Sequence, residues 1–211
     1  MKDSNKRTPL HISGDSLTFE SPSWEQTYSL LLKLAEDIQK SKFKPDIILG
    51  ISRGGWIPAR ILSDLLENPN LANVKAEFYI GIGETKPEPT ITQPICIPVK
   101  GKKVLIVDDL ADTGKSLKLV NLYLKNHGAS EVRIATIYYK PWSIITPHYY
   151  EKETHNWIVF PWELKETVKK TVETFINNGQ TVKDAKEKLV SSMFDKELTE
   201  QFIKEVIGEE H

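Results

Sequence analysis

The chain has a single cysteine, no long apolar run and almost no net charge. Cys96 is the only cysteine, so no disulfide can form within the chain, as is usual in a reducing cytosol. No apolar stretch approaches the ~18 residues of a membrane-spanning helix, and the N-terminal segment lacks the apolar core of a secretion signal. The 28 Lys and Arg residues and 29 Asp and Glu residues give a net charge of -1, which argues against nucleic acid as a partner. We therefore expect a cytoplasmic, soluble protein that binds neither nucleic acid nor membrane.

The rest of the composition is that of an ordinary globular protein. With 211 residues, 39% of them hydrophobic, the chain is long enough for one well-buried domain with an appendage. No internal repeat is apparent. Composition alone indicates no function.

Apolar patterning predicts strands and helices that alternate along most of the chain. We expect helices at 24–39, 58–66 and 115–126, strands at 47–51, 76–82, 104–107, 132–139 and 157–160, and a long mobile loop or loose hairpin at 83–98. This alternation is typical of an α/β protein with a mainly parallel sheet covered by helices on both sides. Its ligands should lie at the carboxyl ends of the strands.

The chain changes character from Lys165 onward. Eighteen of the last 47 residues are charged, and three helical patterns follow one another. Gly179 is placed to end the first helix, Thr181 with Asp184 resembles the capped start of the second, and Asp195 could cap the third. We predict a helical C-terminal extension over residues 165–211, most simply explained as packing over the core or as an oligomer interface.

The segment that indicates a chemistry follows the predicted strand at 104–107. Two adjacent carboxylates, Asp108 and Asp109, come first, and the turn Thr113-Gly114-Lys115-Ser116 then opens a helix. Backbone N–H groups and the dipole at such a helix start form a site for phosphate. A P-loop would need glycine five positions before Gly114, where this chain has Asp109, so that reading is rejected.

The acidic pair and the phosphate turn together suit a sugar phosphate. Vicinal carboxylates can accept hydrogen bonds from neighbouring ribose hydroxyls, directly or through hydrated Mg²⁺. The segment resembles the phosphoribosyl diphosphate signature of the type I phosphoribosyltransferases, and the resemblance extends over residues 45–163. It implies a phosphoribosyltransferase domain over residues 1–164, with the fold of that family and including a small hood. The residues it assigns to phosphoribosyl diphosphate or nucleotide are Arg53, Gly54, Asp108, Asp109, Ala111, Asp112, Thr113, Gly114, Lys115 and Ser116.

The loop Ser52-Arg53-Gly54-Gly55 narrows the resemblance. Its glycines let the backbone approach an anion, and Arg53 could neutralise part of a diphosphate. It looks like the diphosphate loop of the 6-oxopurine phosphoribosyltransferases, particularly of their xanthine-type branch. A non-prolyl cis peptide bond in this loop is implied by the resemblance.

The base side of the site is also read from the resemblance. Lys140 stands where these enzymes place a lysine against the purine oxygen at position 6, and a lysine donor suits a carbonyl better than the amino group of adenine. Trp157 aligns with the aromatic residue that stacks on the purine, and Ile158 is assigned to the base with it. The resemblance assigns one Mg²⁺ to Asp108 and Asp109. Glu163 falls where relatives have an acidic residue near a second Mg²⁺. Val159 stands where xanthine-type relatives have a glutamate, so the preferred purine stays open.

The resemblance implies a Mg²⁺-dependent 6-oxopurine phosphoribosyltransferase that works as a homodimer or homotetramer. Asp112 matches the residue that is proposed to act as general acid or base at the purine N7. The segment 83–98 would close over the reaction, although it lacks the Ser-Tyr pair of hypoxanthine-guanine enzymes. Two alternatives remain: transfer to uracil, orotate or adenine, and a non-catalytic protein of the same fold that senses phosphoribosyl diphosphate or a nucleotide.

Overall fold

The computed structural model describes residues 18–79, 88–191 and 195–208 of the chain. Two compact units make up this part: residues 28–155 form the first, and residues 18–27 with 156–208 form the second. The predicted division between residues 164 and 165 stays a prediction about domains, since compactness divides the chain just after His155. Among the described residues, no helix has both the length and the hydropathy to cross a membrane.

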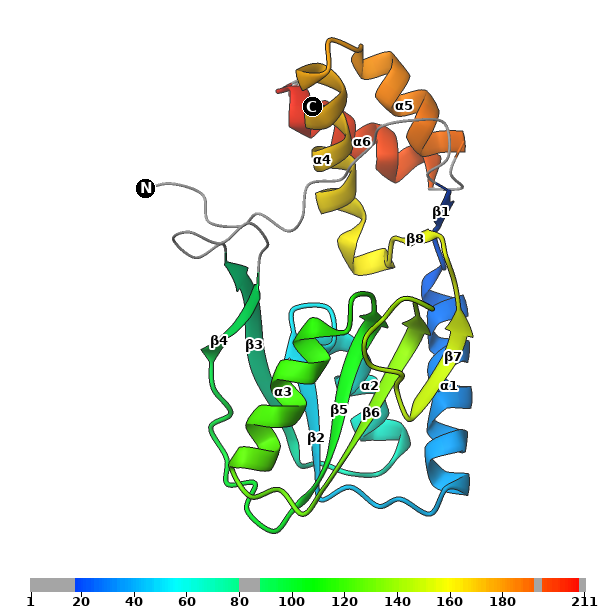
Figure 1. Ribbon diagram of the computed structural model, residues 1–211. Helices are drawn as coiled ribbons and strands as arrows, with labels where there is room; N and C mark the ends of the chain where they lie inside the picture. Colours follow the sequence, from blue (N-terminus) through cyan, green and yellow to red (C-terminus); the bar gives the residue numbers. More distant parts are fainter. Residues whose placement is uncertain (1–17, 80–87, 192–194, 209–211) are drawn as a thin grey trace. The chain divides into compact units, whose positions relative to one another are not determined.

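The first unit is built on a six-stranded sheet of order β4-β3-β2-β5-β6-β7 (Figure 1). All neighbouring pairs are parallel except β3 and β4, which are antiparallel. The strands are β2 (Ile47–Ser52), β3 (Leu71–Tyr79), β4 (Glu88–Gln93), β5 (Lys103–Ala111), β6 (Glu131–Tyr139) and β7 (Tyr149–Glu153). This arrangement confirms the predicted α/β fold with a mainly parallel sheet.

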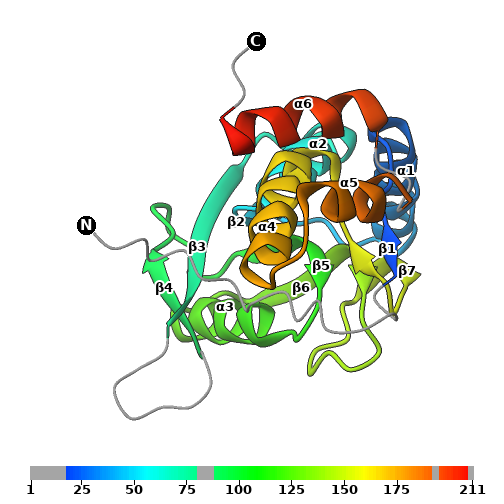
Figure 2. The ribbon, with the colours of Figure 1, turned by 90° about the horizontal axis from the view of Figure 1, so that it is seen from above.

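Helices cover both faces of this sheet. Helix α3 (Lys115–Asn126) lies on one face, while α2 (Trp56–Leu65) and α1 (Trp24–Lys40) lie on the other (Figures 1 and 2). Alternate residues of β2 therefore enter different cores: Leu49 packs in the cluster that contains Leu117 and Val120 of α3, whereas Gly50 lies against Ala59 of α2. This two-sided burial explains why the central strands are almost continuously apolar.

The three helices predicted in this unit are confirmed with ends within two residues of the prediction, since α2 begins at Trp56 where residue 58 was predicted, and the capping signals of α1 and α3 are also found. At the start of α1 the Gln26 N–H donates to Ser23 Oγ at 3.2 Å, and the Ser23 N–H donates to Gln26 Oε1 at 2.8 Å. This reciprocal pair is the predicted capping box. Helix α3 ends at Asn126 and is closed as expected by Gly128, whose φ of 81° is in the left-handed region that favours glycine.

Several strands differ from the prediction, and β3, β4 and β7 are three of them. β3 begins at Leu71, before the predicted start at residue 76, and residues 80–82 lie outside the described residues. Within the segment 83–98, residues 88–93 form β4, so the hairpin alternative holds for them, and residues 83–87 lie outside the described part. β7 was missed because its sequence, Tyr-Tyr-Glu-Lys-Glu, is polar, as an exposed edge strand allows.

The second unit combines a short two-stranded sheet with the helical tail. β1 (Phe19–Glu20) pairs in parallel with β8 (Trp157–Ile158), and η1 (Pro161–Glu163) follows. The strand predicted over 157–160 is thus only two residues long, because the chain turns into η1 at Pro161. Helices α4 (Leu164–Asn177), α5 (Val182–Ser191) and α6 (Lys196–Ile207) bury a shared core that includes Val168, Val172, Phe175, Leu189 and Ile203.

The capping residues predicted in the tail are also found in their places. The Asp184 N–H donates to Thr181 Oγ1 at 3.2 Å, and the Thr181 N–H donates to Asp184 Oδ2 at 2.8 Å. Asp195 caps α6 by accepting from the Leu198 N–H at 2.8 Å. The caps of α5 and α6, together with the apolar core that the two helices share with α4, agree with the predicted helical extension.

Candidate active site

The predicted site residues of the first unit lie at the carboxyl ends of three neighbouring strands or directly after them. Arg53 and Gly54 come directly after β2, the segment Asp108–Ser116 covers the end of β5 and the start of α3, and Lys140 follows β6. Since β2, β5 and β6 are adjacent and parallel, their carboxyl ends share one edge of the sheet (Figure 1). The topology therefore brings the anion, sugar and base assignments of this unit together.

The loop after β2 is pressed against β5. The Ser52–Arg53 peptide bond is cis, which confirms the expectation for this loop. A Cβ on Gly54 would lie 2.0 Å from Asp109 Oδ2, and a Cβ on Gly55 would lie 2.4 Å from the Val107 carbonyl oxygen. Neither position has room for a side chain in this geometry, so the two glycines are what allow the loop to lie against the acidic pair.

Asp108 and Asp109 lie within β5, which corrects the prediction that the strand ends at Val107. Asp108 pairs with Thr136 of β6, and the ladder continues to Ala111 opposite Tyr139. Both carboxylates are half-buried, and the Asp109 N–H donates to Asp108 Oδ1 at 3.0 Å. The strand continues beyond its apolar run because its last residues stay paired with β6, although the side chains of Asp108 and Asp109 are only half-buried.

The turn between β5 and α3 has the geometry of an anion site. Gly114 has a φ of 74° and is the N-cap of α3, so its conformation requires glycine or a strained substitute. A Cβ there would also meet Ser143 Oγ at 2.4 Å. Thr113 is exposed, Ser116 is half-buried, and the first backbone N–H groups of α3 begin beside them. These N–H groups and hydroxyls are the donors that a phosphate needs.

Lys115 forms an ion pair that sequence reasoning missed. Its ammonium contacts the carboxylate of Glu88, the first residue of β4. The side chain of Lys115 is 30% exposed and that of Glu88 is 58% exposed, so the pair lies at the surface. Nothing in the sequence around Glu88 indicated this contact, because it depends on the antiparallel pairing of β4 with β3.

A second charged group lies on β3, next to the loop that follows β2. Lys75, the register partner of Ser52, contacts Glu77 at 2.8 Å. Hydrogen bonding from Lys75 holds the pKa of Glu77 below its usual value, and Thr92 and the positive charge of Arg53 act in the same direction.

Lys140 and Asp112 are brought together on the base side. Lys140 is only 4% exposed. Its backbone N–H donates to the Ala111 carbonyl at 3.0 Å, and this bond joins the end of β6 to the end of β5. Asp112, the residue after Ala111, is exposed, and its Oδ1 accepts from the indole N–H of Trp142 at 3.3 Å. Trp142 was not among the predicted residues.

Comparison with known proteins agrees with this geometry. The family model of the phosphoribosyl transferase domain matches residues 23–168. The chain belongs to the phosphoribosyltransferase family. It is 35% identical over 121 residues to a xanthine-guanine phosphoribosyltransferase of Cereibacter sphaeroides, an alignment that covers 56% of this chain and 68% of the relative.

Two solved structures resemble this phosphoribosyltransferase. A purine phosphoribosyltransferase from Pyrococcus horikoshii is 41% identical, with a TM-score of 0.63 over 69% of this chain and 95% of that one. A protein of Neisseria gonorrhoeae, described as hypothetical and with bound ppGpp, is 25% identical, with a TM-score of 0.64 over 71% and 92% of the two chains. The family match ends early in α4, so the rest of the helical tail lies beyond it.

The remaining predicted residues of this phosphoribosyltransferase lie in its second unit. Trp157 and Ile158 form β8, where the Trp157 side chain is 38% exposed and the Ile158 side chain 5% exposed. Glu163 ends η1 and is half-buried. Their assignments to the base and to a second metal stay predictions. Val159 is buried in the core formed with the tail helices.

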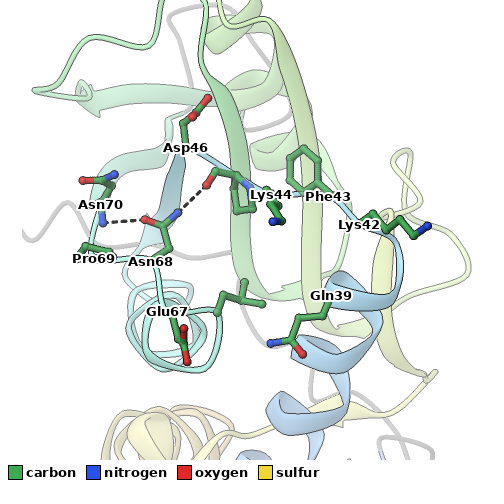
Figure 3. Close-up of a pocket in the computed structure, with 11 residues that line it drawn as sticks. Gln39, Lys42, Phe43, Lys44, Asp46, Glu67, Asn68, Pro69 and Asn70 are labelled. Carbon is green, nitrogen blue, oxygen red and sulfur yellow. Dashed lines mark hydrogen bonds between the residues drawn. The ribbon is translucent and has the colours of Figure 1, made fainter.

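A hollow of about 600 Å³ lies at the opposite end of the strands of the first unit. It is lined by residues that precede β2 and β3, among them Lys42, Asp46, Glu67 and Asn70. Figure 3 shows Asn68 within it, donating to the Pro45 carbonyl at 2.7 Å and accepting from the Asn70 N–H at 2.9 Å. Asn68 thus joins the segment before β2 to the segment before β3 at the amino ends of these strands, at the opposite end of the sheet from the predicted site residues of this unit.

Proposed function

We propose that this chain transfers the 5-phosphoribosyl group from phosphoribosyl diphosphate to a ring nitrogen of a 6-oxopurine and releases diphosphate. The observation that carries the proposal is the convergence of three segments at neighbouring strand ends: the loop Ser52–Gly55, the acidic pair with its phosphate turn, and the buried Lys140. The first two suit phosphoribosyl diphosphate, and the third offers a donor to a purine carbonyl. The names of the relatives, xanthine-guanine and purine phosphoribosyltransferases, support the same substrate class.

The roles follow from the kind of group each residue presents. Arg53 and Gly54 would hold the diphosphate, Asp108 and Asp109 the ribose hydroxyls, and the turn from Ala111 to Ser116 the 5-phosphate. Asp112 would exchange a proton with the purine N7 while Lys140, Trp157 and Ile158 hold the base. Positive charge develops at the anomeric carbon during such a transfer, so fixed groups that orient the sugar and neutralise the leaving diphosphate lower the barrier.

Mg²⁺ is the cofactor that this site suits. Asp108 and Asp109 offer half-buried carboxylates at a strand end, and Mg²⁺ is usually held by one or two carboxylates together with substrate phosphates. Among the described residues, no group of three or more Asp, Glu, His or Cys side chains could hold a metal. When bound, the ion would neutralise charge on the diphosphate. Glu163 is proposed for a second ion, and the homodimer or homotetramer and the cytoplasmic location stay predictions.

An assay with separate bases tests the reaction. The protein is incubated with phosphoribosyl diphosphate, Mg²⁺ and hypoxanthine, guanine, xanthine, adenine, uracil or orotate in turn, and nucleotide and diphosphate are measured. We expect a nucleoside monophosphate from one or more of the three 6-oxopurines, and loss of turnover when EDTA removes the metal. Turnover confined to adenine, uracil or orotate would contradict the assignment of Lys140.

A nucleotide-sensing role is the second candidate. It is favoured by the relative with bound ppGpp, and the helical tail would then serve as an interaction module. The two roles differ in one measurement, because a sensor binds phosphoribosyl diphosphate or nucleotide without forming product from any base. Titration calorimetry beside the assay above therefore separates them.

The Lys115–Glu88 ion pair leads to a prediction about phosphate affinity. Removing the carboxylate in Glu88→Gln takes away the group that competes with the 5-phosphate for the Lys115 ammonium. An exposed pair of this kind is worth up to about 1 kcal/mol, so we expect the KM for phosphoribosyl diphosphate to fall by up to about fivefold. Glu153→Gln, on the edge strand β7, is the matched control and should leave this KM unchanged. A KM that rises in Glu88→Gln would show that Glu88 helps to hold Lys115 in place for the phosphate.

A further inference from the structure

The chain that leaves β6 forms a turn directly over the loop that leaves β5. Lys140, Pro141, Trp142 and Ser143 make a four-residue turn, in which the Ser143 N–H donates to the Lys140 carbonyl at 2.9 Å. Proline at its second position favours this turn, because the fixed φ of proline matches what the turn requires. Trp142 therefore occupies the third position of a defined turn.

Hydrogen bonds on both sides hold this turn against the neighbouring loop. The Lys140 N–H donates to the Ala111 carbonyl at 3.0 Å, and the Ile144 N–H donates to the Thr113 carbonyl at 3.1 Å. Ser143 also lies so close to Gly114 that a Cβ on the glycine would meet its Oγ at 2.4 Å. Along the chain, Asp112 stands between the accepting residues Ala111 and Thr113, and Trp142 stands between the donating residues Lys140 and Ile144. Their side chains are thus held opposite each other by the backbone.

The indole of Trp142 contacts both polar groups assigned to the base. Its N–H donates to Asp112 Oδ1 at 3.3 Å. The ammonium of Lys140 lies over the indole, 5.2 Å from the ring centroid, within the range of a cation–π interaction. The imidazole of His155 packs against the same indole, with the ring centroids 5.6 Å apart. One side chain therefore meets a carboxylate with its edge and an ammonium with its face.

Packing alone does not account for this tryptophan. Trp142 is 52% exposed, so it adds little to the core, and the three side chains described above that meet its indole are polar. Asp112 is itself exposed, and a carboxylate in solvent samples several rotamers unless a donor fixes it. A donor on a rigid aromatic ring, placed by a bonded turn, reduces that freedom.

We propose that Trp142 is a positioning residue of the purine half of the site. Its N–H orients the carboxylate of Asp112 toward the base, and its ring holds the ammonium of Lys140 in place for the purine oxygen. The inference rests on the proposed function, since it takes the roles of Asp112 and Lys140 from there. It adds Trp142 and its contacts with Asp112 and Lys140 to the residues that the resemblance assigned to the site.

Two substitutions separate the contacts. Trp142→Phe keeps an aromatic face for Lys140 but removes the N–H, so we expect kcat to fall about tenfold, the usual value of a hydrogen bond to a charged group, with the KM for the purine within about twofold. Trp142→Ala removes both contacts, so the KM for the purine should also rise by about three- to tenfold. The KM for phosphoribosyl diphosphate should stay unchanged in both variants. Ile144→Ala, which removes an exposed side chain of the same segment, is the matched control and should behave as the unsubstituted protein.

A double-mutant cycle tests whether Trp142 acts through Asp112. In an Asp112→Ala background the indole has no carboxylate to orient, so Trp142→Phe should leave the residual kcat unchanged. The same tenfold loss in both backgrounds, or no loss in either, would overturn the proposal. So would a Trp142→Ala variant whose KM values for both substrates rise together with a lower Tm, because that is the result of a structural role. If the unsubstituted protein forms no nucleotide from any base, the proposed function fails, and this inference fails with it.

Discussion

Asp112→Asn is expected to lower kcat by about 10²- to 10⁴-fold, the usual contribution of a general acid or base. Asparagine has nearly the same shape, and its side-chain oxygen can still accept from the Trp142 indole, so the loop keeps the contact seen at 3.3 Å. What is lost is the ability to take up or release a proton. The affinity for phosphoribosyl diphosphate should change little, because the substitution leaves the backbone of the phosphate turn in place, and the diphosphate and ribose are assigned to other residues.

The measurement is a comparison of steady-state kcat with the Kd of phosphoribosyl diphosphate from calorimetry. Asp46→Asn is a suitable control, because Asp46 accepts from the Lys103 N–H at 2.8 Å at the other end of the sheet. That variant should keep its kcat. If Asp112→Asn loses turnover and affinity by equal factors, Asp112 maintains the loop and is not the proton-transfer group.

Local signals were enough to predict the helices and most of the sheet. The capping box at Ser23, the cap at Asp195 and the glycine after α3 each depend on residues three or four positions apart, and such contacts form wherever the sequence allows them. The buried strands β2 and β5 were recognisable because covered faces demand apolar residues on both sides. The order of the loops after these strands then indicated the phosphoribosyl diphosphate site.

The features that the sequence did not reveal all depend on contacts between distant segments. β5 continues through Asp108 because β6 supplies hydrogen-bond partners for it, and β7 forms at an edge where polar residues are tolerated. The Lys115–Glu88 pair joins residues 27 positions apart. The Trp142–Asp112 contact joins residues 30 positions apart and needs both loops in place. A Lys-Pro-Trp-Ser turn after a strand is not distinctive, so only the structure shows that its tryptophan faces Asp112.

The two glycines after β2 are expected to respond differently to the same substitution. In Gly54→Ala the three atoms nearest to the new Cβ all belong to the carboxylate of Asp109, whose Oδ2 lies 2.0 Å from the Cβ position. A side chain can move aside, so the protein should fold, with Asp109 displaced from the place where it would hold the ribose. A displacement of about 1 Å can cost about 10²-fold in rate, and we expect kcat/KM for phosphoribosyl diphosphate to fall by roughly that factor.

In Gly55→Ala the new Cβ would instead meet backbone, 2.4 Å from the Val107 oxygen and 2.8 Å from both Asp108 Cα and the Ile51 oxygen. Backbone in paired strands cannot move aside without breaking the ladder, so the cost appears as lost stability of about 3 kcal/mol, or a Tm lower by about 6–12 °C. Thermal unfolding measured beside the kinetics separates the two cases. Equal Tm losses in both variants would contradict the distinction, and a Gly54→Ala variant with unchanged kcat/KM would show that Asp109 does not need its observed position. The close approach of this loop to β5 would then serve the fold, and the ribose would depend on Asp108.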